Sequence, residues 1–405
     1  MTDALRSAVA ARFDDLCDLT ARLVRERSVL GDEAGAIAVV HERLERLGFA
    51  VERVAIDPEA ALADPHGGYP ALSYEGRTNV AGRLRGSGGR SSLHLSGHVD
   101  VVPADGAGRW TYDPWGAEIA DGRMWGRGAG DMKSGIAAYL IAVEAFLEVC
   151  GPPAGDLLFT AVIEEECGGN GMRAVLGAGY DGDETLIAEP FWPDLGNGGV
   201  GVIWARLEAL GSGKHAAQAD EVAPPVDALI AAAGALRALE AELNARRGDR
   251  LFSDAFTHPY NLNLGAISGG VWPSSVPTDA TLRIRLGFGR DLEPVAAQQL
   301  VAERVAAAAP SVRVTFDGFR AHAYHHDPAT PLADVVSQAH EELHGARPRP
   351  GVFTGTTDAR YVTGPCYCYG PLAGNLHGID EWVDLASCQS VAETIALVLE
   401  RRLGS

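Results

Sequence analysis

The chain has few cysteines and few basic residues. Six cysteines are spread over 405 residues, which is too few and too scattered for a disulfide framework and indicates a reducing compartment. Lys and Arg number 34 against 54 Asp and Glu, for a formal net charge of -20. This balance argues against nucleic acids and anionic membranes as partners, because both are bound through basic patches.

Long apolar runs are also missing. No stretch reaches the roughly 20 residues that a membrane-spanning helix needs. Residues 1–30 place acidic side chains among periodic Leu and Val, which is typical of an amphipathic helix and not of a signal peptide. We therefore expect a cytoplasmic protein without a membrane or nucleic-acid partner.

The length of the chain exceeds one ordinary hydrophobic core, so two domains are expected. Up to residue 198, short apolar strands alternate with helices, which predicts a mostly parallel sheet covered by helices. Residues 199–318 change to the order strand-helix-strand-strand-helix-strand, a split βαβ, ferredoxin-like pattern. The predicted fold is thus α/β, with a catalytic domain of residues 1–198 and 319–405 and an inserted α+β lid at 199–318.

Residues 97–135 hold the first candidate functional side chains. The run at 92–96 is short and partly alternating, as in a strand, and we expect it to pair with residues 79–84 across the turn at 86–89. His98 and Asp100 follow this strand one residue apart, and a glycine-rich turn presents Asp131 just before a helix. A His and an Asp on two glycine-flanked turns form a candidate metal site.

More candidate ligands follow other predicted strands. Glu164, Glu165 and Glu166 end an apolar strand at 156–163, Glu189 ends another at 184–188, and His377 lies in a late glycine-rich loop. A lone His or Glu is usually a solvated side chain, and three successive glutamates are usually a surface patch. The recurrence of such residues at the ends of several strands favours a shared site, because ligands bind at the carboxyl ends of strands in α/β sheets.

Two His and three carboxylates suit a pair of divalent ions such as zinc or cobalt. Ions about 3.5 to 4 Å apart need a bridging carboxylate, and Asp131 is the natural bridge because it comes from its own turn. Asp100 suits a supporting position, where it accepts the second ring N–H of His98 and fixes its tautomer. A general base must stay unligated near the water that it activates.

These residues lie in motifs that resemble a known superfamily. The motifs are GHVDVVP, WxxDPW with the later DGRMWGRGAGDMKSG, EEECGG, AEP and GNLHG, and they extend from about residue 79 to the C-terminus. They resemble the superfamily of acetylornithine deacetylase, succinyl-diaminopimelate desuccinylase, aminoacylase-1 and glutamate carboxypeptidase. The resemblance implies a catalytic domain with two metal ions and an inserted lid domain that forms a homodimer.

The resemblance also implies a role for each matching residue. His98 and Glu189 would bind one ion, Glu166 and His377 the other, and Asp131 would bridge them. Glu165 would be the general base, and Glu164, where the superfamily often has Asp, would be structural. The ions would be Zn²⁺, with Co²⁺ or Mn²⁺ as alternatives.

In the lid, the resemblance implies that His215 reaches the active site of the partner subunit and stabilises an oxyanion. The alternative is a surface His on a loop. Asn263 and Arg285 also match and would bind substrate. Two positions depart from the superfamily: it often has Asn where this chain has Ser274 or Ser275, and Asp where this chain has Arg283.

Arg360 would bind a substrate carboxylate, because its forked guanidinium suits that group. The alternative is a structural ion pair with Asp358 or another acid. His322, His325 and His326 form a local cluster. We favour a loop where the chain returns from the lid over a metal site there, because no carboxylate-bearing strand end accompanies them.

The sequence thus predicts a metal-dependent amidohydrolase that removes an acyl group from a small N-acyl amino acid. A dipeptidase or glutamate-type carboxypeptidase, or a deformylase-type amidase, is the alternative within the same chemistry, with a short peptide as a further substrate class. A silent metal-binding homologue is the alternative of another class. It should have lost Glu165 or a ligand, and every one of these residues is present.

Overall fold

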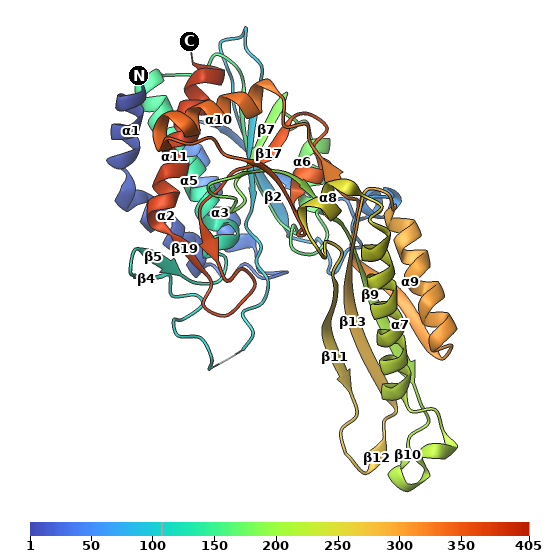
Figure 1. Ribbon diagram of the computed structural model, residues 1–405. Coiled ribbons are helices and arrows are strands. Elements are labelled where there is room, and N and C mark those ends of the chain that lie inside the picture. The colour runs from blue at the N-terminus through green and yellow to red at the C-terminus, as the bar shows by residue number, and fades with distance from the viewer. Residues whose placement is uncertain (107, 405) are drawn as a thin grey trace.

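The computed structural model describes residues 1–106 and 108–404. They form a body of helices around a large sheet and an elongated arm that extends from it (Figure 1). The chain enters the arm through β9 and returns to the body through β14, so the arm is an insertion within the body. No helix in this part of the chain is long and apolar enough to cross a membrane.

The body contains a sheet of nine strands within the described residues, in the order β1-β2-β6-β3-β7-β17-β8-β15, with β16 also paired to β8. Their bounds are β1 Ala50–Ala55, β2 Thr78–Leu84, β3 Leu93–His98, β6 Leu157–Val162, β7 Glu184–Ile187, β8 Leu195–Gly199, β15 Tyr324–His325, β16 Pro350–Phe353 and β17 Cys366–Cys368. The central strands β6, β3, β7 and β17 are parallel neighbours. On the flanks, β16 pairs with β8 in parallel and the other pairs are antiparallel, so the sheet is parallel at its centre, as predicted, and mixed as a whole.

The predicted hairpin between residues 79–84 and 92–96 is wrong. β2 pairs with β1 and β6, and β6 lies between β2 and β3. Local spacing favoured a hairpin, but β3 ends at the functional residues and takes a central place with parallel neighbours on both sides. Its residues are all buried, as expected for a central parallel strand.

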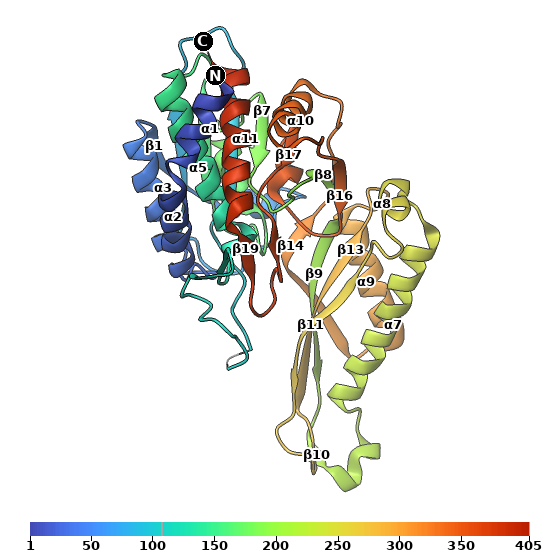
Figure 2. The ribbon, with the colours of Figure 1, turned by 60° about the vertical axis from the view of Figure 1, so that its left-hand side comes forward.

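Helices of the body pack against the large sheet and each other. Their bounds are α1 Thr2–Ala10, α2 Phe13–Arg25, α3 Ala34–Arg46, α4 Pro58–Ala63, α5 Ser134–Cys150, α6 Asn170–Gly177, α10 Pro331–His344 and α11 Leu385–Leu403. The helix α5 is mostly apolar and largely buried, since α1, α2 and α11 cover it on the side away from the sheet (Figure 2). This packing holds the N-terminus of α5, and the turn before it, against the end of β3.

A small sheet of the order β18-β19-β5-β4 lies beside the turn that precedes α5. Its strands are β4 Glu118–Ala120, β5 Arg123–Trp125, β18 Ala373–Gly374 and β19 Trp382–Asp384. The turn itself, η1, is a π-helical segment at Ala129–Lys133. A 3-10 turn, η3, follows β16 at Asp358–Tyr361.

The arm contains the predicted split βαβ unit. Its four antiparallel strands have the order β11-β13-β9-β14 and the bounds β9 Gly201–Leu210, β11 Leu262–Gly269, β13 Asp279–Phe288 and β14 Val312–Ala321. Helices α7 Pro225–Arg246 and α9 Pro294–Ala308 cover one face, and α8 Arg250–Ala255 follows α7. A small two-stranded antiparallel sheet of β10 Lys214–His215 and β12 Ser275–Val276, with the turn η2 Ala216–Glu221, forms the far tip (Figure 1).

The body and the arm each have their own hydrophobic core. The core of the arm lies between its sheet and α7 and α9, where strand residues such as Leu207 and Leu282 meet helix residues such as Leu236 and Val301. The opposite face of the arm sheet carries Trp204, Arg206, Arg283 and Arg285 and is free of helices. That uncovered face turns toward the functional residues of the body.

Candidate metal centre and active site

The predicted ligands come together at the carboxyl edge of the large sheet. His98 is the last residue of β3, Glu165 and Glu166 follow β6, and Glu189 follows β7. Because β3, β6 and β7 are parallel, their ends meet at one edge of the sheet. The turn η1 carries Asp131, and the loop after β18 carries His377.

Asp131 lies between two imidazole rings. Its Oδ1 is 3.1 Å from Nε2 of His98, and its Oδ2 is 3.3 Å from Nε2 of His377. Nε2 of His377 is also 3.0 Å from Oε2 of Glu166. On the other side, Nε2 of His98 is 3.9 Å from both Glu165 Oε2 and Glu189 Oε1. Each oxygen of Asp131 thus faces a different imidazole, which is the arrangement of a bridging carboxylate.

These donor atoms fit divalent ions. Ligands about 2.1 Å from a tetrahedral zinc ion are about 3.4 Å from one another. The distances between neighbouring donor atoms here extend from 3.0 to 3.9 Å. Two triplets have all their ligand atoms within 4.8 Å, namely His98 with Glu165 and Glu189, and His98 with Asp131 and Glu166. Glu165 therefore lies as close to His98 as Glu189 does, and distance alone does not separate a base from a ligand.

Burial and mutual charge shift the protonation of the site. Burial disfavours a charge on His98, but its hydrogen bond to Asp131 and the charges of Glu189 and Glu165 outweigh burial and raise the pKa of His98 well above its ordinary value. Burial also opposes ionisation of Asp131, yet the hydrogen bonds from His377 and His98 prevail and lower its pKa.

Burial raises the pKa of Glu165 well above its usual range, and the charge of Glu189 adds to this against the opposing charge of His98. Glu189 is shifted in the same direction by burial and by Asp131. These carboxylates are 4% and 6% exposed, so they hold protons easily until a cation comes near. A buried acidic cluster of this kind is typical of a metal centre or a catalytic site.

Asp100 supports the site differently from the prediction. The ring N–H at Nδ1 of His98 donates to the backbone carbonyl of Asp100 at 2.9 Å, whereas the carboxylate Oδ1 is 3.7 Å away. The carboxylate instead accepts the backbone N–H groups of Glu165 and Glu166, at 3.2 and 3.1 Å. Asp100 thus orients both β3 and the segment after β6, and the tautomer of His98 is set by a carbonyl.

Glu381 is a supporting residue that the sequence did not reveal. Its Oε1 accepts the backbone N–H groups of Gly128, Gly130 and Asp131, each at 3.0 Å, and its Oε2 pairs with the guanidinium of Arg127. Glu381 is fully buried. It holds η1, and therefore Asp131, from the opposite end of the chain. Its only sequence signal is a position four residues after His377 in the same loop.

Two other residues near the centre are structural. Glu164 accepts the hydroxyl of Tyr74 at 2.6 Å and a guanidinium N–H of Arg77 at 3.0 Å, so it points away from the donor cluster. Lys133 donates to the backbone carbonyl of Glu26 at 2.8 Å. Lys133 and Arg127 therefore anchor the turn.

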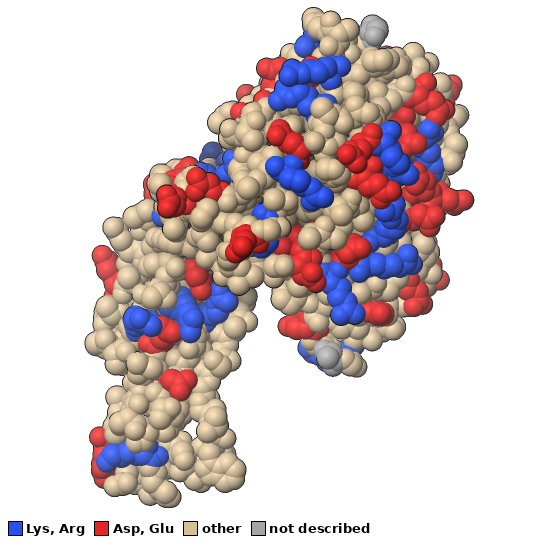
Figure 3. Space-filling view, turned by 180° about the vertical axis from the view of Figure 1, so that it is seen from behind, with Lys and Arg blue, Asp and Glu red and all other residues tan. Residues whose placement is uncertain are grey.

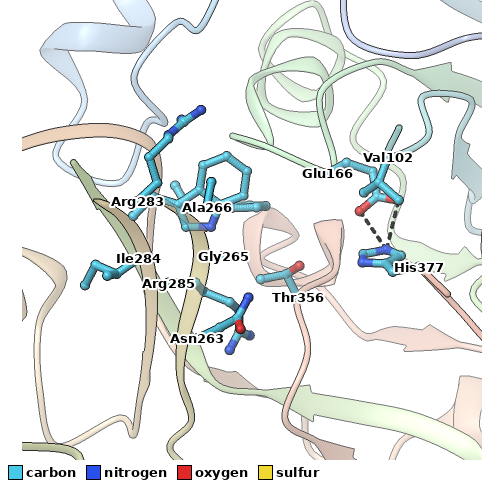
Figure 4. A pocket seen from close by; sticks show the side chains of 12 residues that line it. Val102, Glu166, Asn263, Gly265, Ala266, Arg283, Ile284, Arg285, Thr356 and His377 are labelled. Atoms are coloured by element: carbon cyan, nitrogen blue, oxygen red, sulfur yellow. Dashed lines mark hydrogen bonds and ion pairs between the residues drawn. The ribbon is translucent and has the colours of Figure 1, made fainter. Parts of the chain in front are cut away.

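A cavity of about 310 Å³ lies between the donor cluster and the uncovered face of the arm sheet. Glu166 and His377 line it from the body, and Asn263 and Arg285 line it from the arm (Figure 4). Arg285 donates to the carbonyl of Thr354 at 3.0 Å. Burial, together with the charge of Arg360, lowers the pKa of Arg285 to about 10. The structure thus brings both predicted arm residues to the site.

Arg360 does not lie where the prediction put it. It is buried, and its guanidinium donates to the backbone carbonyls of Thr357 at 3.0 Å, His322 at 2.7 Å and Val200 at 3.3 Å. It ties the turn η3 to the strands that link body and arm. The ion pair with Asp358, the predicted alternative, is absent from the ion pairs of the described chain. Nη2 of Arg360 has no hydrogen-bond partner among the described residues, but Arg360 is buried and lines neither cavity beside the donor cluster.

His215 lies far from the metal residues of its own chain. It is exposed on β10 at the tip of the arm, where Nδ1 accepts the N–H of Ala217 at 3.1 Å (Figure 1). His322 and His326 lie outside strands where the chain returns from the arm, as favoured, whereas His325 belongs to the short strand β15. His326 bonds the carbonyl of Ala359, and His325 contacts the amide of Asn197.

Comparison with known proteins agrees with this geometry. Residues 94–401 match the model described as Peptidase family M20/M25/M40. The chain belongs to this family. A succinyl-diaminopimelate desuccinylase from Rhodospirillum centenum is 32% identical over 397 residues, which cover 94% of this chain and 95% of that protein. One from Paracoccus denitrificans is 29% identical over 402 residues, covering 96% and 98%.

Solved structures of the M20 family share the fold. A di-peptidase from Saccharomyces cerevisiae superposes with a TM-score of 0.79 at 17% identity, covering 99% of this chain and 98% of that one. Human carnosine dipeptidase 1 gives 0.78 at 16% identity, covering 98% and 99%. A peptidase of the M20 family from Bacillus subtilis, described as dinuclear metal binding, gives 0.58 at 15% identity, covering 97% and 99%. The predicted α/β fold is confirmed, and the chain is a metal-dependent M20 hydrolase of amide bonds.

Proposed function

We propose that this protein is a deacylase that removes the acyl group from a small N-acyl amino acid, with two Zn²⁺ ions held by the five predicted ligands. The observation that carries the proposal is the placement of Asp131 between His98 and His377, with Glu166 and Glu189 on the two outer sides. The names of the relatives that are about 30% identical, succinyl-diaminopimelate desuccinylases, support deacylation.

His98 and Glu189 hold one ion in this proposal, Glu166 and His377 hold the other, and Asp131 binds both. When bound, such ions polarise an amide carbonyl and lower the pKa of water. Co²⁺ or Mn²⁺ would suit the same donors. Glu381 and Asp100 position the ligands from behind, through the backbone N–H groups that they accept.

Glu165 is the general base. It takes a proton from the attacking water at its carboxylate and gives that proton to the amine nitrogen as the amide bond breaks. The raised pKa of Glu165, caused by burial and by Glu189, suits a carboxylate that must hold this proton between the two steps.

The amino-acid half of the substrate occupies the cavity of Asn263 and Arg285. Arg285 supplies a guanidinium for a carboxylate, and Asn263, its direct partner across β11 and β13, supplies an amide. Arg360 is not part of this binding site, because it is buried and lines neither of the cavities beside the donor cluster.

The proposal includes a homodimer formed through the lid, with the boundaries 199–318 predicted from the sequence. The strand β11 is an exposed edge of the arm sheet and carries Ile267 at 70% exposure, followed by Val271 at 98% and Trp272 at 67%. Charged side chains crowd the body and are sparser on the arm (Figure 3). Exposed apolar edge strands of this kind mark interfaces. In such a dimer, His215 would reach the active site of the partner subunit and stabilise the oxyanion there.

Supporting evidence for a cytoplasmic setting is that all six cysteines are free.

The test of the function is hydrolysis after removal of metal with a chelator. Purified protein is assayed for release of free amine from N-acetyl, N-succinyl and N-formyl amino acids and from dipeptides, with and without added Zn²⁺ or Co²⁺. Metal-restored release from N-acyl amino acids supports the proposal. Cleavage of dipeptides alone would make the protein a peptidase, and failure to bind metal would overturn the proposed centre.

A further inference from the structure

A second cavity adjoins the first at the donor cluster. It has a volume of about 480 Å³ and shares Glu166, Arg285, Thr356 and His377 with the first cavity. An amide held over the donor cluster therefore has one half in each cavity. The two cavities differ in the chemistry of their remaining walls.

One wall of the second cavity is apolar and is built from neighbours of the metal residues. Phe191 lies two residues after Glu189, and Leu376 directly precedes His377. Phe353 ends β16 and meets Phe191 edge to face, with ring centroids 5.0 Å apart and an angle of 86° between the planes. All three side chains are partly exposed to the cavity. The apolar surface is thus attached to the same segments that place the ligands.

Two glycines make room for the aromatic rings. A Cβ at Gly196 would lie 2.7 Å from the ring of Phe191, and a Cβ at Gly355 would lie 2.6 Å from the ring of Phe353. Both rings therefore lie directly against bare backbone. A side chain at either glycine would push a ring into the cavity and reduce its volume, so the space depends on these two positions.

The two cavities differ in the charged side chains that line them, and this difference assigns each half of the substrate to one cavity. The first cavity adds Asn263 and Arg283 to the shared Arg285, whereas Arg285 is the one Arg or Lys among the described residues that line the second. The carboxylate of an N-acyl amino acid consequently belongs in the first cavity, beside the guanidinium groups. The acyl group then lies in the second cavity, against the apolar wall.

We infer that the preferred substrate carries an apolar, aromatic acyl group, seated on Phe191, Phe353 and Leu376. This inference rests on the proposed function and names its substrate class. The three side chains of the apolar wall offer no donor to a second carboxylate. Arg285, which lines both cavities, is engaged by the carboxylate of the amino-acid half, so the charge of a dicarboxylic acyl group such as succinyl has no free cationic partner in the second cavity. An aromatic ring on the acyl group gains edge contacts with both phenylalanines.

The test compares three substrates that differ only in the acyl group: N-phenylacetyl-, N-acetyl- and N-succinyl-alanine, each with the metal-loaded full chain. We expect kcat/KM for the phenylacetyl substrate to exceed the others by about tenfold or more, since each apolar carbon group in a fitting pocket is worth ~10-fold or more. Phe191→Ala and Phe353→Ala should each lower the phenylacetyl-to-acetyl ratio by about tenfold.

The matched control is Phe256→Ala, a partly exposed phenylalanine beyond α8 that lines neither cavity; it should keep the ratio of the unaltered protein. Binding is measured separately by calorimetry with Glu165→Gln, which should favour the phenylacetyl compound over the succinyl one. A preference for the succinyl substrate, or a ratio unchanged by both wall variants, would overturn the inference while the proposed function stands. Failure to hydrolyse all three would overturn the proposed function instead, and the binding ratio would then decide the inference.

Discussion

Glu165 and Glu166 are adjacent, yet the site uses them differently. Glu166 contacts the ring of His377 at 3.0 Å, whereas Glu165 is buried among acidic neighbours and is 3.9 Å from the nearest ring nitrogen of His98. Glu166 is thus the one of the two that contacts His377, and we propose Glu166 as the ligand and Glu165 as the group that transfers the proton. The backbone bonds of both residues to Asp100 hold this division in place.

We predict that Glu165→Gln lowers kcat by about 10²- to 10⁴-fold, because a carboxamide cannot carry the proton from water to the amine. The isosteric amide keeps the packing, so the melting temperature and the content of two metal ions per chain should stay unchanged. Turnover is measured beside metal analysis of the same sample. Normal turnover with both ions bound would show that another group is the base.

We also predict that metal binding releases protons. The charges of Glu166 and Asp131, with burial opposing them, raise the pKa of His377 to about 11 in the metal-free protein. At neutral pH the ring is therefore protonated, but a ligand must be neutral. Apparent metal affinity should rise as pH rises, by about tenfold per pH unit for each proton released. Calorimetry in buffers of different ionisation enthalpy counts these protons, and a pH-independent affinity would contradict the prediction.

At the scale of elements, the turn η1 depends on a residue 250 positions away in the chain. Glu381 accepts the N–H of Asp131 and of two glycines beside it, and pairs with buried Arg127. The carboxylate of Asp131, the proposed bridge, is therefore positioned by the loop that leads into β19 as well as by α5.

We predict that Glu381→Ala weakens metal binding by about 10- to 100-fold and destabilises the protein by about 3–5 kcal/mol, since Arg127 is left buried without its partner. Glu381→Gln is the matched control: its carbonyl oxygen can still accept the three N–H groups, so metal affinity should suffer less than in the alanine variant. Affinity is measured by competition with a chelating dye. An equal loss of metal affinity in both variants would show that the charge of Glu381 matters, and not the orientation of the turn.

At the scale of the molecule, the arm leaves an apolar edge exposed that the body does not cover. We predict that the protein is a dimer with twice the chain mass of 42.6 kDa, and that Trp272→Asp shifts it toward the monomer because a charge is buried at the interface. Light scattering after size exclusion measures the mass. Phe256→Ala, away from this edge, is the control. A monomeric unaltered protein would contradict the proposed interface.

Much of this molecule follows from local sequence. Apolar strands that end in His or Glu next to glycines pointed to the edge where His98, Glu166 and Glu189 meet. The split βαβ order of the arm also follows from alternation and helix periodicity. The neighbours of β2 in the sheet could not be predicted in this way, because the order of strands depends on long-range packing that spacing along the chain does not report.

The sequence by itself determined which donor atoms this protein has and at which strand ends they lie, because residue type and strand periodicity are local properties. Only the tertiary structure decided which of them touch. Glu381 accepts the backbone N–H of Asp131, and the ring N–H of His98 donates to a backbone carbonyl. The carboxylate of Asp100 accepts the backbone N–H groups of two glutamates. Arg360 is buried among backbone carbonyls, away from the cavities. Contacts between residues far apart in the chain depend on how sheet and loops pack, and no short stretch of sequence contains that information.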